Sequence, residues 1–216
     1  MKYLFLDFNG TVLDDVDLCL NLLNEMLVLK GLKTVSLKRY KEIFTFPIRT
    51  YYDKAGFTYN GYTFEELADY FITEYDKRNL KESFIFADFK EFADGIRGLG
   101  YKLVLCSASL YSLLMKQLYD FGIANCFDDV IALDNHHAAS KLLLAQDYVK
   151  THDVDLTCSY FVGDTTHDAL VGKECGLKVF LIDRGHQASE ILEKTGELVY
   201  HSFKELLAYF VEKRTL

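Results

Sequence analysis

Short hydrophobic runs recur along the chain, and five of them have the length and composition of buried β-strands: Tyr3–Phe8, Leu103–Cys106, Val130–Leu133, Tyr160–Val162 and Val179–Ile182. Continuous apolar runs of this kind are typical of strands that are covered on both faces of a parallel sheet. Three of the runs end directly before small or acidic residues, which places polar side chains at the ends of predicted strands.

Stretches with helical spacing of apolar residues lie between these runs, at Phe89–Leu99, Tyr111–Phe121, Lys141–Val149 and Asp168–Cys175. From about Lys81 onward, strands and helices therefore alternate. This alternation predicts an α/β fold with a doubly wound, Rossmann-like parallel sheet.

The segment after the first strand breaks the alternation. Stretches such as DLCLNLLNEMLVLKGL and FEELADYFITEYDKRNL have helical spacing and contain no strand-like run. We interpret residues 15–80 as a helical cap inserted into a core made of residues 1–14 and 81–216. The predicted hinges lie near Leu13–Asp15 and Asn79–Glu82, and a cap of this kind is expected to open and close over the core.

The charge balance narrows the class of partner. The chain has 24 basic and 32 acidic residues and a net charge of -8, which argues against a nucleic-acid binder or a protein held on an anionic membrane. Half of the residues are hydrophobic, enough to bury one good core. We expect a monomer or weak homodimer whose partner is a small molecule.

The N-terminus and the cysteines indicate a cytoplasmic protein. MKYLFLDFNG has a short apolar run that ends in a charge, unlike a signal peptide or a transmembrane segment. The five cysteines form no CxxC pair, which suits reduced thiols that fill the core.

Candidate chemistry follows the strands, because ligands of open α/β sheets bind beyond the carboxyl ends of the strands. Asp7 lies at the end of the first predicted strand and precedes Gly10 and Thr11, in a turn where backbone N–H groups can approach an anion. A carboxylate there can be a nucleophile, although it can equally cap the turn.

The segment GDTTHD contains two carboxylates, Asp164 and Asp168, where a predicted strand meets a helix. Together with Asp7 they could form an oxygen-rich site for Mg²⁺. The alternative is that Asp164 or Thr165 caps the helix and Asp168 stabilises its first turn. We expect His167 to pack or face solvent, because the surrounding ligand set is oxygen.

Ser107 and Lys141 are candidates for binding an anion. Ser107 follows the second strand and is predicted to open a helix, where its hydroxyl and nearby N–H groups can receive a phosphate oxygen. Lys141 begins an apolar helix, a position that the helix dipole disfavours for a cation, so it either neutralises a nearby anion or is solvated.

In this order, the four segments LDFNGT, LVLCSAS, Lys141 and VGDTTHDAL resemble the four motifs of the haloacid dehalogenase superfamily of phosphotransferases. The likeness spans the chain, with residues 15–79 resembling the helical cap that this family inserts after its first motif. The branch that it resembles is that of phosphoglycolate phosphatase and β-phosphoglucomutase.

The resemblance implies roles for individual residues. Asp7 would attack phosphorus and form an aspartyl-phosphate. Asp7, Asp164 and the backbone carbonyl of Asn9 would hold Mg²⁺, and Asp168 would orient the metal's water ligands or Lys141. The residues that would bind the phosphoryl oxygens are Gly10, Thr11, Ser107, Ala108 and Lys141.

Asn9 departs from the family pattern. Phosphatases of the family usually have an aspartate there, which protonates the leaving oxygen and then activates water. An amide cannot carry that proton, and general acid–base catalysis typically contributes about 10²–10⁴-fold. We therefore expect catalysis to be slowed unless the leaving group is good; deamidation of the Asn9-Gly10 pair would generate the acid.

Two alternatives to a phosphatase remain open at this point, and a third is disfavoured. A slow or inactive protein that binds phosphate esters would keep the fold and the ligand set. Phosphonatases of the family lack the second aspartate and use a cap lysine, for which Lys30, Lys33 and Lys54 are candidates. Haloalkanoate dehalogenases need no metal, so the acidic pair in GDTTHD argues against that branch.

Substrate specificity is expected to come from the cap. FTFPIRTYYDKAG predicts a helix that begins after Pro47 and ends at Gly56, with Arg49 near its start. If that helix start faces the site, Arg49 could bind a second anionic group of the substrate. The alternative is that the aromatic residues pack the cap and Arg49 is solvated.

Overall fold

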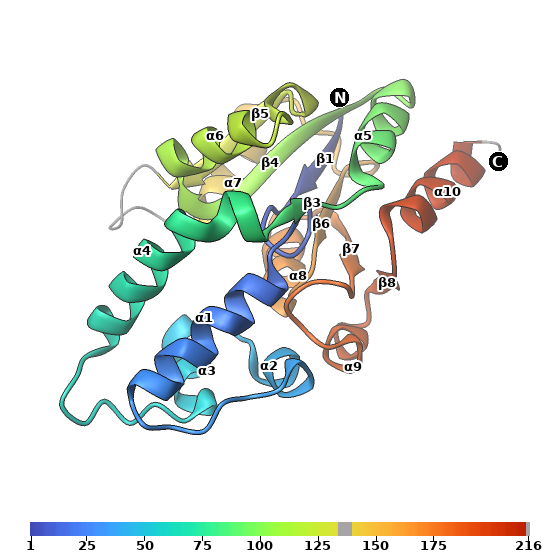
Figure 1. Ribbon diagram of the computed structural model, residues 1–216. Helices are drawn as coiled ribbons and strands as arrows, with labels where there is room; N and C mark the ends of the chain where they lie inside the picture. Colours follow the sequence, from blue (N-terminus) through green and yellow to red (C-terminus); the bar gives the residue numbers. More distant parts are fainter. Residues whose placement is uncertain (134–139, 215–216) are drawn as a thin grey trace.

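The computed structural model describes residues 1–133 and 140–214. Its centre is a parallel sheet of six strands in the order β5-β4-β1-β6-β7-β8 (Figure 1). The strands are β1 (Lys2–Leu6), β4 (Tyr101–Leu110), β5 (Asp129–Leu133), β6 (Tyr160–Gly163), β7 (Lys178–Ile182) and β8 (Leu198–Tyr200). The predicted α/β fold and its five strands are confirmed; β8 was missed because it is three residues long and poorly buried.

Helices cover both faces of this sheet. They are α5 (Phe89–Gly98), α6 (Tyr111–Asp120), α7 (Lys141–Thr151), α8 (Thr166–Glu174), α9 (Ser189–Leu192) and α10 (Phe203–Arg214), with 3₁₀ turns at Ala124–Cys126 and Glu193–Thr195. The four helices predicted from the periodicity correspond to α5, α6, α7 and α8.

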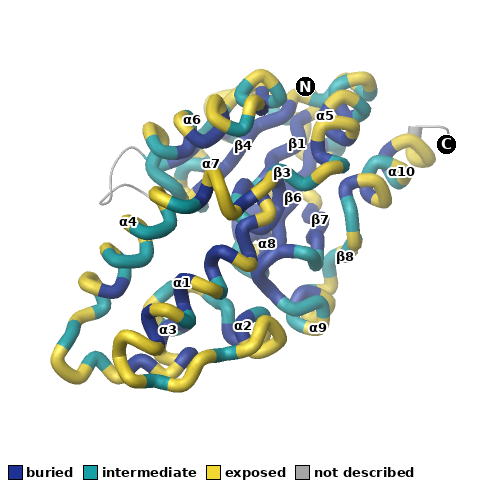
Figure 2. The backbone as a smooth tube through the Cα atoms, viewed as in Figure 1, coloured by how far each residue is buried: buried dark blue, intermediate teal, exposed yellow. Residues whose placement is uncertain are grey.

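The continuous apolar strands are explained by the two-sided burial of the sheet (Figure 2). Successive side chains of a strand point to opposite faces. In β1, Leu4 and Leu6 belong to the core cluster under α5 and α10, whereas Tyr3 and Phe5 belong to the cluster on the other face, where Tyr148 of α7 packs edge-on against Phe5. Neither face of β1 therefore tolerates polar residues.

The segment after β1 folds into four helices, α1 (Val16–Leu29), α2 (Leu37–Ile43), α3 (Ile48–Ala55) and α4 (Phe64–Glu82). They have a separate core that includes Met26, Tyr40 and Tyr52. The sequence signals at two of the helix ends are confirmed: α3 begins after Pro47 and Gly56 ends it in the left-handed conformation, at φ 114. We refer to α1–α4 as the cap.

Two short strands, β2 (Leu13–Asp14) and β3 (Phe84–Ile85), pair antiparallel where the chain enters and leaves the cap. The second predicted hinge, Asn79–Glu82, lies instead within the last turn of α4. Figure 1 shows the cap beside the carboxyl ends of the strands, with the N-terminus at the opposite end of the sheet. Among the described helices, none is long and apolar enough to cross a bilayer.

Candidate active site

The turn after β1 is held by its own backbone. The carbonyl of Phe8 accepts hydrogen bonds from the N–H groups of Val12 and Leu13, both at 2.9 Å. The N–H of Asp7 donates to the carbonyl of Val162 in β6, also at 2.9 Å, which fixes the start of the turn against the neighbouring strand. Asp7 therefore lies at the carboxyl edge of the sheet, between two strands.

A glycine is required at the centre of this turn. Gly10 has φ +73, and a Cβ there would lie 2.3 Å from Asp164 Oδ2 and 2.6 Å from His186 Cδ2. An L-residue with a side chain is disfavoured at that φ, and the contacts leave it no room. Gly10 thus lets the turn approach the loops that follow β6 and β7.

Three carboxylates and one ammonium group form the centre of the site. Carboxylate oxygens of Asp7, Asp164 and Asp168 lie within 4.8 Å of one another. The Lys141 ammonium lies 2.7 Å from Asp168 Oδ1 and also donates to the Asp7 carboxylate. Lys141 is 4% exposed, so it neutralises buried carboxylates and is not solvated.

The segment GDTTHD caps α8, as the alternative interpretation predicted, and its two carboxylates also face the cluster. Thr165 caps α8 and forms a capping box with Asp168, whose Oδ2 accepts from the Thr165 hydroxyl at 2.6 Å. The same Asp168 side chain binds Lys141 through Oδ1. Asp164 accepts from the Thr11 hydroxyl at 3.2 Å and from the backbone N–H of His186 at 2.6 Å. Capping therefore fixes one carboxylate of the cluster, and loop contacts fix another.

Ser107 does not open a helix, which corrects the sequence prediction. It lies inside β4, and α6 begins four residues later at Tyr111, with Leu110 as its N-cap. The buried Ser107 hydroxyl accepts from the N–H of Ser109 at 3.1 Å. The apolar run had suggested a strand ending at Cys106, but backbone pairing of β4 with β5 resumes at Leu110 after an irregularity.

The strand register still places Ser107 and Ala108 at the edge of the sheet where Asp7 lies. Leu105 pairs with Leu6 in the parallel ladder, so the residues after each meet at that edge. Ser107 is 2% exposed, whereas Ala108 is exposed. Ala108 is therefore accessible to a ligand at this edge.

The Asn9 side chain is held by two residues near the cap. Its Nδ2 donates to Asp15 Oδ2 and to the Tyr75 hydroxyl, both at 2.8 Å. Tyr75, from α4, donates to the same oxygen of Asp15 at 2.7 Å. Asp15 also accepts from the N–H of Gly10 at 3.0 Å. The amide thus lies against a carboxylate that already accepts several hydrogen bonds.

His186 is a residue of the site that the sequence analysis missed. It is 4% exposed, with Nε2 3.2 Å from Asp15 Oδ1 and Nδ1 2.8 Å from the Tyr40 hydroxyl of α2. The segment DRGHQ follows the run Val179–Ile182, so the rule that ligands bind after parallel strands could have indicated it.

The carboxylates of the cluster differ in pKa. Burial is the largest influence on Asp7 and, with the nearby Asp168 carboxylate, raises its pKa to about 8 against the opposing effect of Lys141. Burial likewise raises the pKa of Asp164 to about 6. Burial would also raise the pKa of Asp168, but Lys141 lowers it. Lys141 and Asp168 are therefore an ion pair, whereas Asp7 and Asp164 hold their protons more tightly than ordinary aspartates as long as no cation lies between them.

This donor set fits a hard divalent cation. Mg²⁺ prefers oxygen ligands and is usually held by one or two carboxylates and by substrate phosphate. The cluster offers carboxylate oxygens from three aspartates that are buried or half-buried, and a bound cation would favour their ionised forms. Asp15, Cys19 and His186 form a second group that could hold a metal, but His186 and Asp15 are already paired and hydrogen-bonded.

Arg49, within the cap, and His167, in the core, both pack against aromatic rings of the cap. The Arg49 guanidinium lies 4.9 Å from the centre of the Tyr59 ring and 5.8 Å from that of Phe64, both in the cap segment. Binding of substrate by Arg49 stays a prediction. His167 packs against the ring of Phe46 at 4.8 Å, as expected for a packing residue.

The chain belongs to the haloacid dehalogenase-like hydrolases, whose family pattern matches residues 4–182. It is similar to a phosphoglycolate phosphatase of Caulobacter vibrioides, with 27% identity over 143 residues that cover 65% of this chain and 60% of the relative. The aligned region therefore spans about three fifths of that relative's length.

Solved structures share the fold over nearly the whole chain. A haloacid dehalogenase-like hydrolase from Streptococcus pneumoniae has a TM-score of 0.82 at 18% identity and covers 97% of this chain and 98% of its own. A family hydrolase from Deinococcus radiodurans, solved with bound phosphate and sodium, has a TM-score of 0.73 at 14% identity, covering 98% and 96%. The predicted family resemblance is confirmed.

Proposed function

We propose that this protein is a Mg²⁺-dependent phosphatase that hydrolyses a small phosphate monoester, with Asp7 as the nucleophile. The observation that carries the proposal is the buried cluster in which Lys141 binds Asp7 and Asp168 beside Asp164. The family membership and the similarity to a phosphoglycolate phosphatase support the same activity.

In the proposed reaction, a carboxylate oxygen of Asp7 attacks phosphorus and the ester oxygen leaves. The aspartyl-phosphate that results is then hydrolysed by water, which releases phosphate and restores Asp7. Lys141 and the backbone N–H groups near Ala108 would bind phosphoryl oxygens. Mg²⁺, held by Asp7, Asp164 and the carbonyl of residue 9, would supply positive charge next to the transferring group, with Asp168 orienting Lys141.

The hydrogen bonds of Asn9 define how this phosphatase would treat its leaving group. The Nδ2 group donates its hydrogen bonds to Asp15 and Tyr75, and an amide is too weak an acid to give a proton to the leaving oxygen. The leaving oxygen would then depart without an acid at residue 9. We infer that the enzyme favours substrates with good leaving groups, such as acyl or aryl phosphates, over alkyl phosphates.

The first experiment measures phosphate release from acetyl phosphate, p-nitrophenyl phosphate and phosphoglycolate, with Mg²⁺ and with EDTA. We expect turnover that requires the metal and is lost in Asp7→Asn. The matched control is Asp147→Asn, which removes an exposed carboxylate on the helix that carries Lys141. If no phosphate ester is hydrolysed although Mg²⁺ binds, the site is a phosphate-binding site without turnover.

A second experiment tests the leaving-group preference. Rates are compared for aryl phosphates whose phenol pKa values span several units. A steep decrease in kcat/KM with rising phenol pKa is expected, because no side chain at residue 9 protonates the leaving oxygen. A flat dependence would show that another group supplies the proton.

A further inference from the structure

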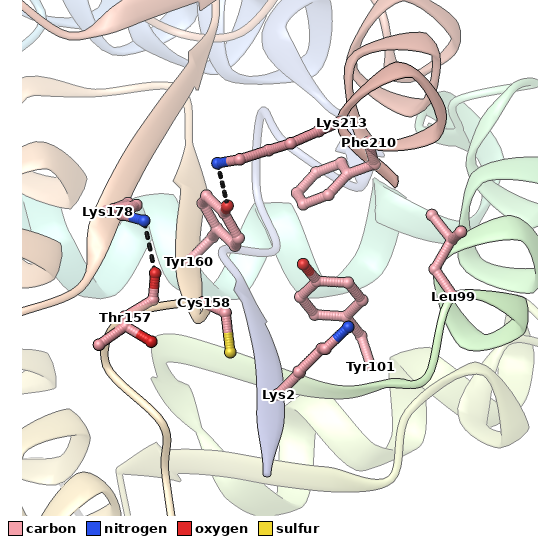
Figure 3. A pocket seen from close by; sticks show the side chains of 9 residues that line it. All are labelled: Lys2, Leu99, Tyr101, Thr157, Cys158, Tyr160, Lys178, Phe210 and Lys213. Carbon is pink, nitrogen blue, oxygen red and sulfur yellow. Dashed lines mark hydrogen bonds between the residues drawn. The ribbon is translucent and has the colours of Figure 1, made fainter. Parts of the chain in front are cut away.

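A pocket with a volume of about 370 Å³ lies at the end of the sheet opposite the active site. It is formed by the amino ends of the strands and by α10 (Figure 3). Lys2 of β1 pairs with Tyr101 of β4, and Tyr160 of β6 pairs with Lys178 of β7, so the parallel register brings these four residues to one edge. The volume is within the range of about 300–1,000 Å³ typical of small-molecule sites.

Three lysines from different elements surround this pocket. They are Lys2, Lys178 and Lys213, all exposed, in a protein whose net charge is -8. In the described part of the chain, none of the three forms a salt bridge with a carboxylate. Gathering like charges without a counterion is unfavourable, so the pocket concentrates positive potential and attracts an anion.

The contacts of these lysines are with neutral groups. Lys213 donates to the hydroxyls of Tyr160 at 2.9 Å and Tyr209 at 3.2 Å, and Lys178 donates to the carbonyl of Thr157 (Figure 3). The Lys2 ammonium lies 5.4 Å from the centre of the Tyr101 ring. A neutral partner leaves the charge uncompensated, so each ammonium can still bind an anion.

Aromatic rings supply the rest of the wall. Tyr101 and Phe210 meet at 5.4 Å and Tyr160 and Phe210 at 5.0 Å, both edge-on, which fixes the rings relative to one another. Tyr101 and Leu99 are partly exposed beside the lysines. A preformed, partly apolar wall next to three ammonium groups suits a ligand with both a flat body and negative charge.

We propose that this pocket binds a small anion that carries two or more negative charges on a flat ring body, the chemistry of a nucleoside diphosphate. Lys2, Lys178 and Lys213 bind the phosphate oxygens, and Tyr101 and Leu99 cover the ring. Lysine is a common phosphate ligand because its ammonium is a compact charge with three donors. The site is separate from the Asp7 cluster, because the two lie at opposite ends of the strands.

The test is a titration of the ¹⁵N-labelled protein with ADP in EDTA, followed by two-dimensional NMR. EDTA prevents metal-dependent turnover during the measurement. Amide shifts at Lys2, Tyr101 and Lys178 are expected to saturate with a Kd below about 1 mM. Adenosine and pyrophosphate are titrated separately, and each is expected to bind at least tenfold more weakly than ADP. Equal binding of pyrophosphate would overturn the ring-binding part of the proposal.

The variant Lys178→Ala/Lys213→Ala is expected to weaken ADP binding at least tenfold. The control is Lys33→Ala/Lys90→Ala, which removes the same charge at two exposed lysines outside the pocket and should leave the Kd unchanged. Equal binding by the pocket variant, no shift at about 10 mM ADP, or shifts confined to Gly10 and Gly163 at the active site would overturn the proposal.

Discussion

Asn9 lies within hydrogen-bond distance of Asp15 and Tyr75, so a carboxylate at residue 9 would face a second carboxylate. Asp15 also binds His186. Burial would raise the pKa of Asp15, but its contacts with His186, Tyr75 and Asn9 lower it. Asp15 is therefore ionised at neutral pH. The local structure around residue 9 favours an amide over the acid that phosphatases of this family usually carry.

We predict that Asn9→Asp destabilises the protein in a pH-dependent way. The new carboxyl group lies beside ionised Asp15, so its pKa in the folded protein is raised and the folded state loses stability as the pH increases. The loss of unfolding free energy is expected to be about 1–3 kcal/mol at pH 8 and smaller at pH 5, as measured by urea unfolding. Asn60→Asp, at an exposed loop position, is the control and should show no such dependence. Equal stability of Asn9→Asp and the natural protein at pH 8 would contradict the argument.

Lys141 is the cation that the cluster depends on. Replacing it by Met leaves Asp7 and Asp168 without their ion-pair partner in a buried site. We predict that Lys141→Met reduces kcat by at least about 10²-fold, because a preorganised positive group near the phosphoryl oxygens is lost. Circular dichroism with and without Mg²⁺ distinguishes this result from unfolding. A rate within threefold of the natural protein would remove Lys141 from the reaction.

At the scale of elements, the loop after β7 connects the core with the cap. His186 is hydrogen-bonded to Tyr40, and Gln187 Nε2 donates to the carbonyl of Phe44 at 2.8 Å. The N–H of Ala188 donates to the carbonyl of Lys41 at 3.1 Å. All three cap partners belong to α2 or its C-cap, so the loop after β7 docks directly on α2 in this conformation.

We predict that Tyr40→Phe loosens α2 without affecting the core. The substitution keeps the ring but removes the hydroxyl that binds His186, and leaving a buried polar group without its partner costs about 1–3 kcal/mol. Hydrogen exchange of the α2 amides should become faster by the factor that corresponds to this loss of free energy. Exchange in α5 should not change. Faster exchange in both helices would indicate global destabilisation rather than a local docking contact.

At the scale of the whole molecule, the buried acids link stability to pH. The pKa of Asp7 is raised from 3.8 to about 8 in the folded protein, so its stabilising contribution is complete below pH 3.8 and is lost as the pH rises through about 8. Burial would lower the pKa of His186, but Asp15 raises it from 6.5 to about 9. The stability that His186 contributes is therefore also lost as the pH rises. The pKa of Asp168 is lowered, so the stability that it contributes is present above pH 3.8 and is lost as the pH falls below that value.

We therefore predict that the metal-free protein loses thermal stability between pH 5 and pH 9. Mg²⁺ should restore more stability at pH 8 than at pH 5, because it binds the ionised carboxylates; at about 100 times its Kd it would add about 2.7 kcal/mol. Asp164→Asn should raise the Tm of the metal-free protein at pH 8 and abolish the response to Mg²⁺. A response to Mg²⁺ that is independent of pH would contradict the charge argument.

The sequence by itself determined the sheet and the main candidates of the site. Strands buried on both faces must be apolar throughout, so β1, β4 and β6 were readable as runs, and the rule for parallel sheets directed attention to Asp7, Ser107 and Asp164. The family resemblance rested on motifs in those same loops. The hydrophobic pattern is sufficient to predict these strands because every residue of a strand buried on both faces must be apolar.

The tertiary structure alone decided which of these side chains meet and what else joins them. It placed Ser107 inside β4, because pairing with β5 resumes beyond the apolar run. It brought His186 and Tyr75 to the turn of Asn9 from positions far along the chain, and it gathered three lysines at the amino edge. These contacts depend on strand register and on the docking of the cap, and neither is encoded in a local pattern of hydrophobic and polar residues.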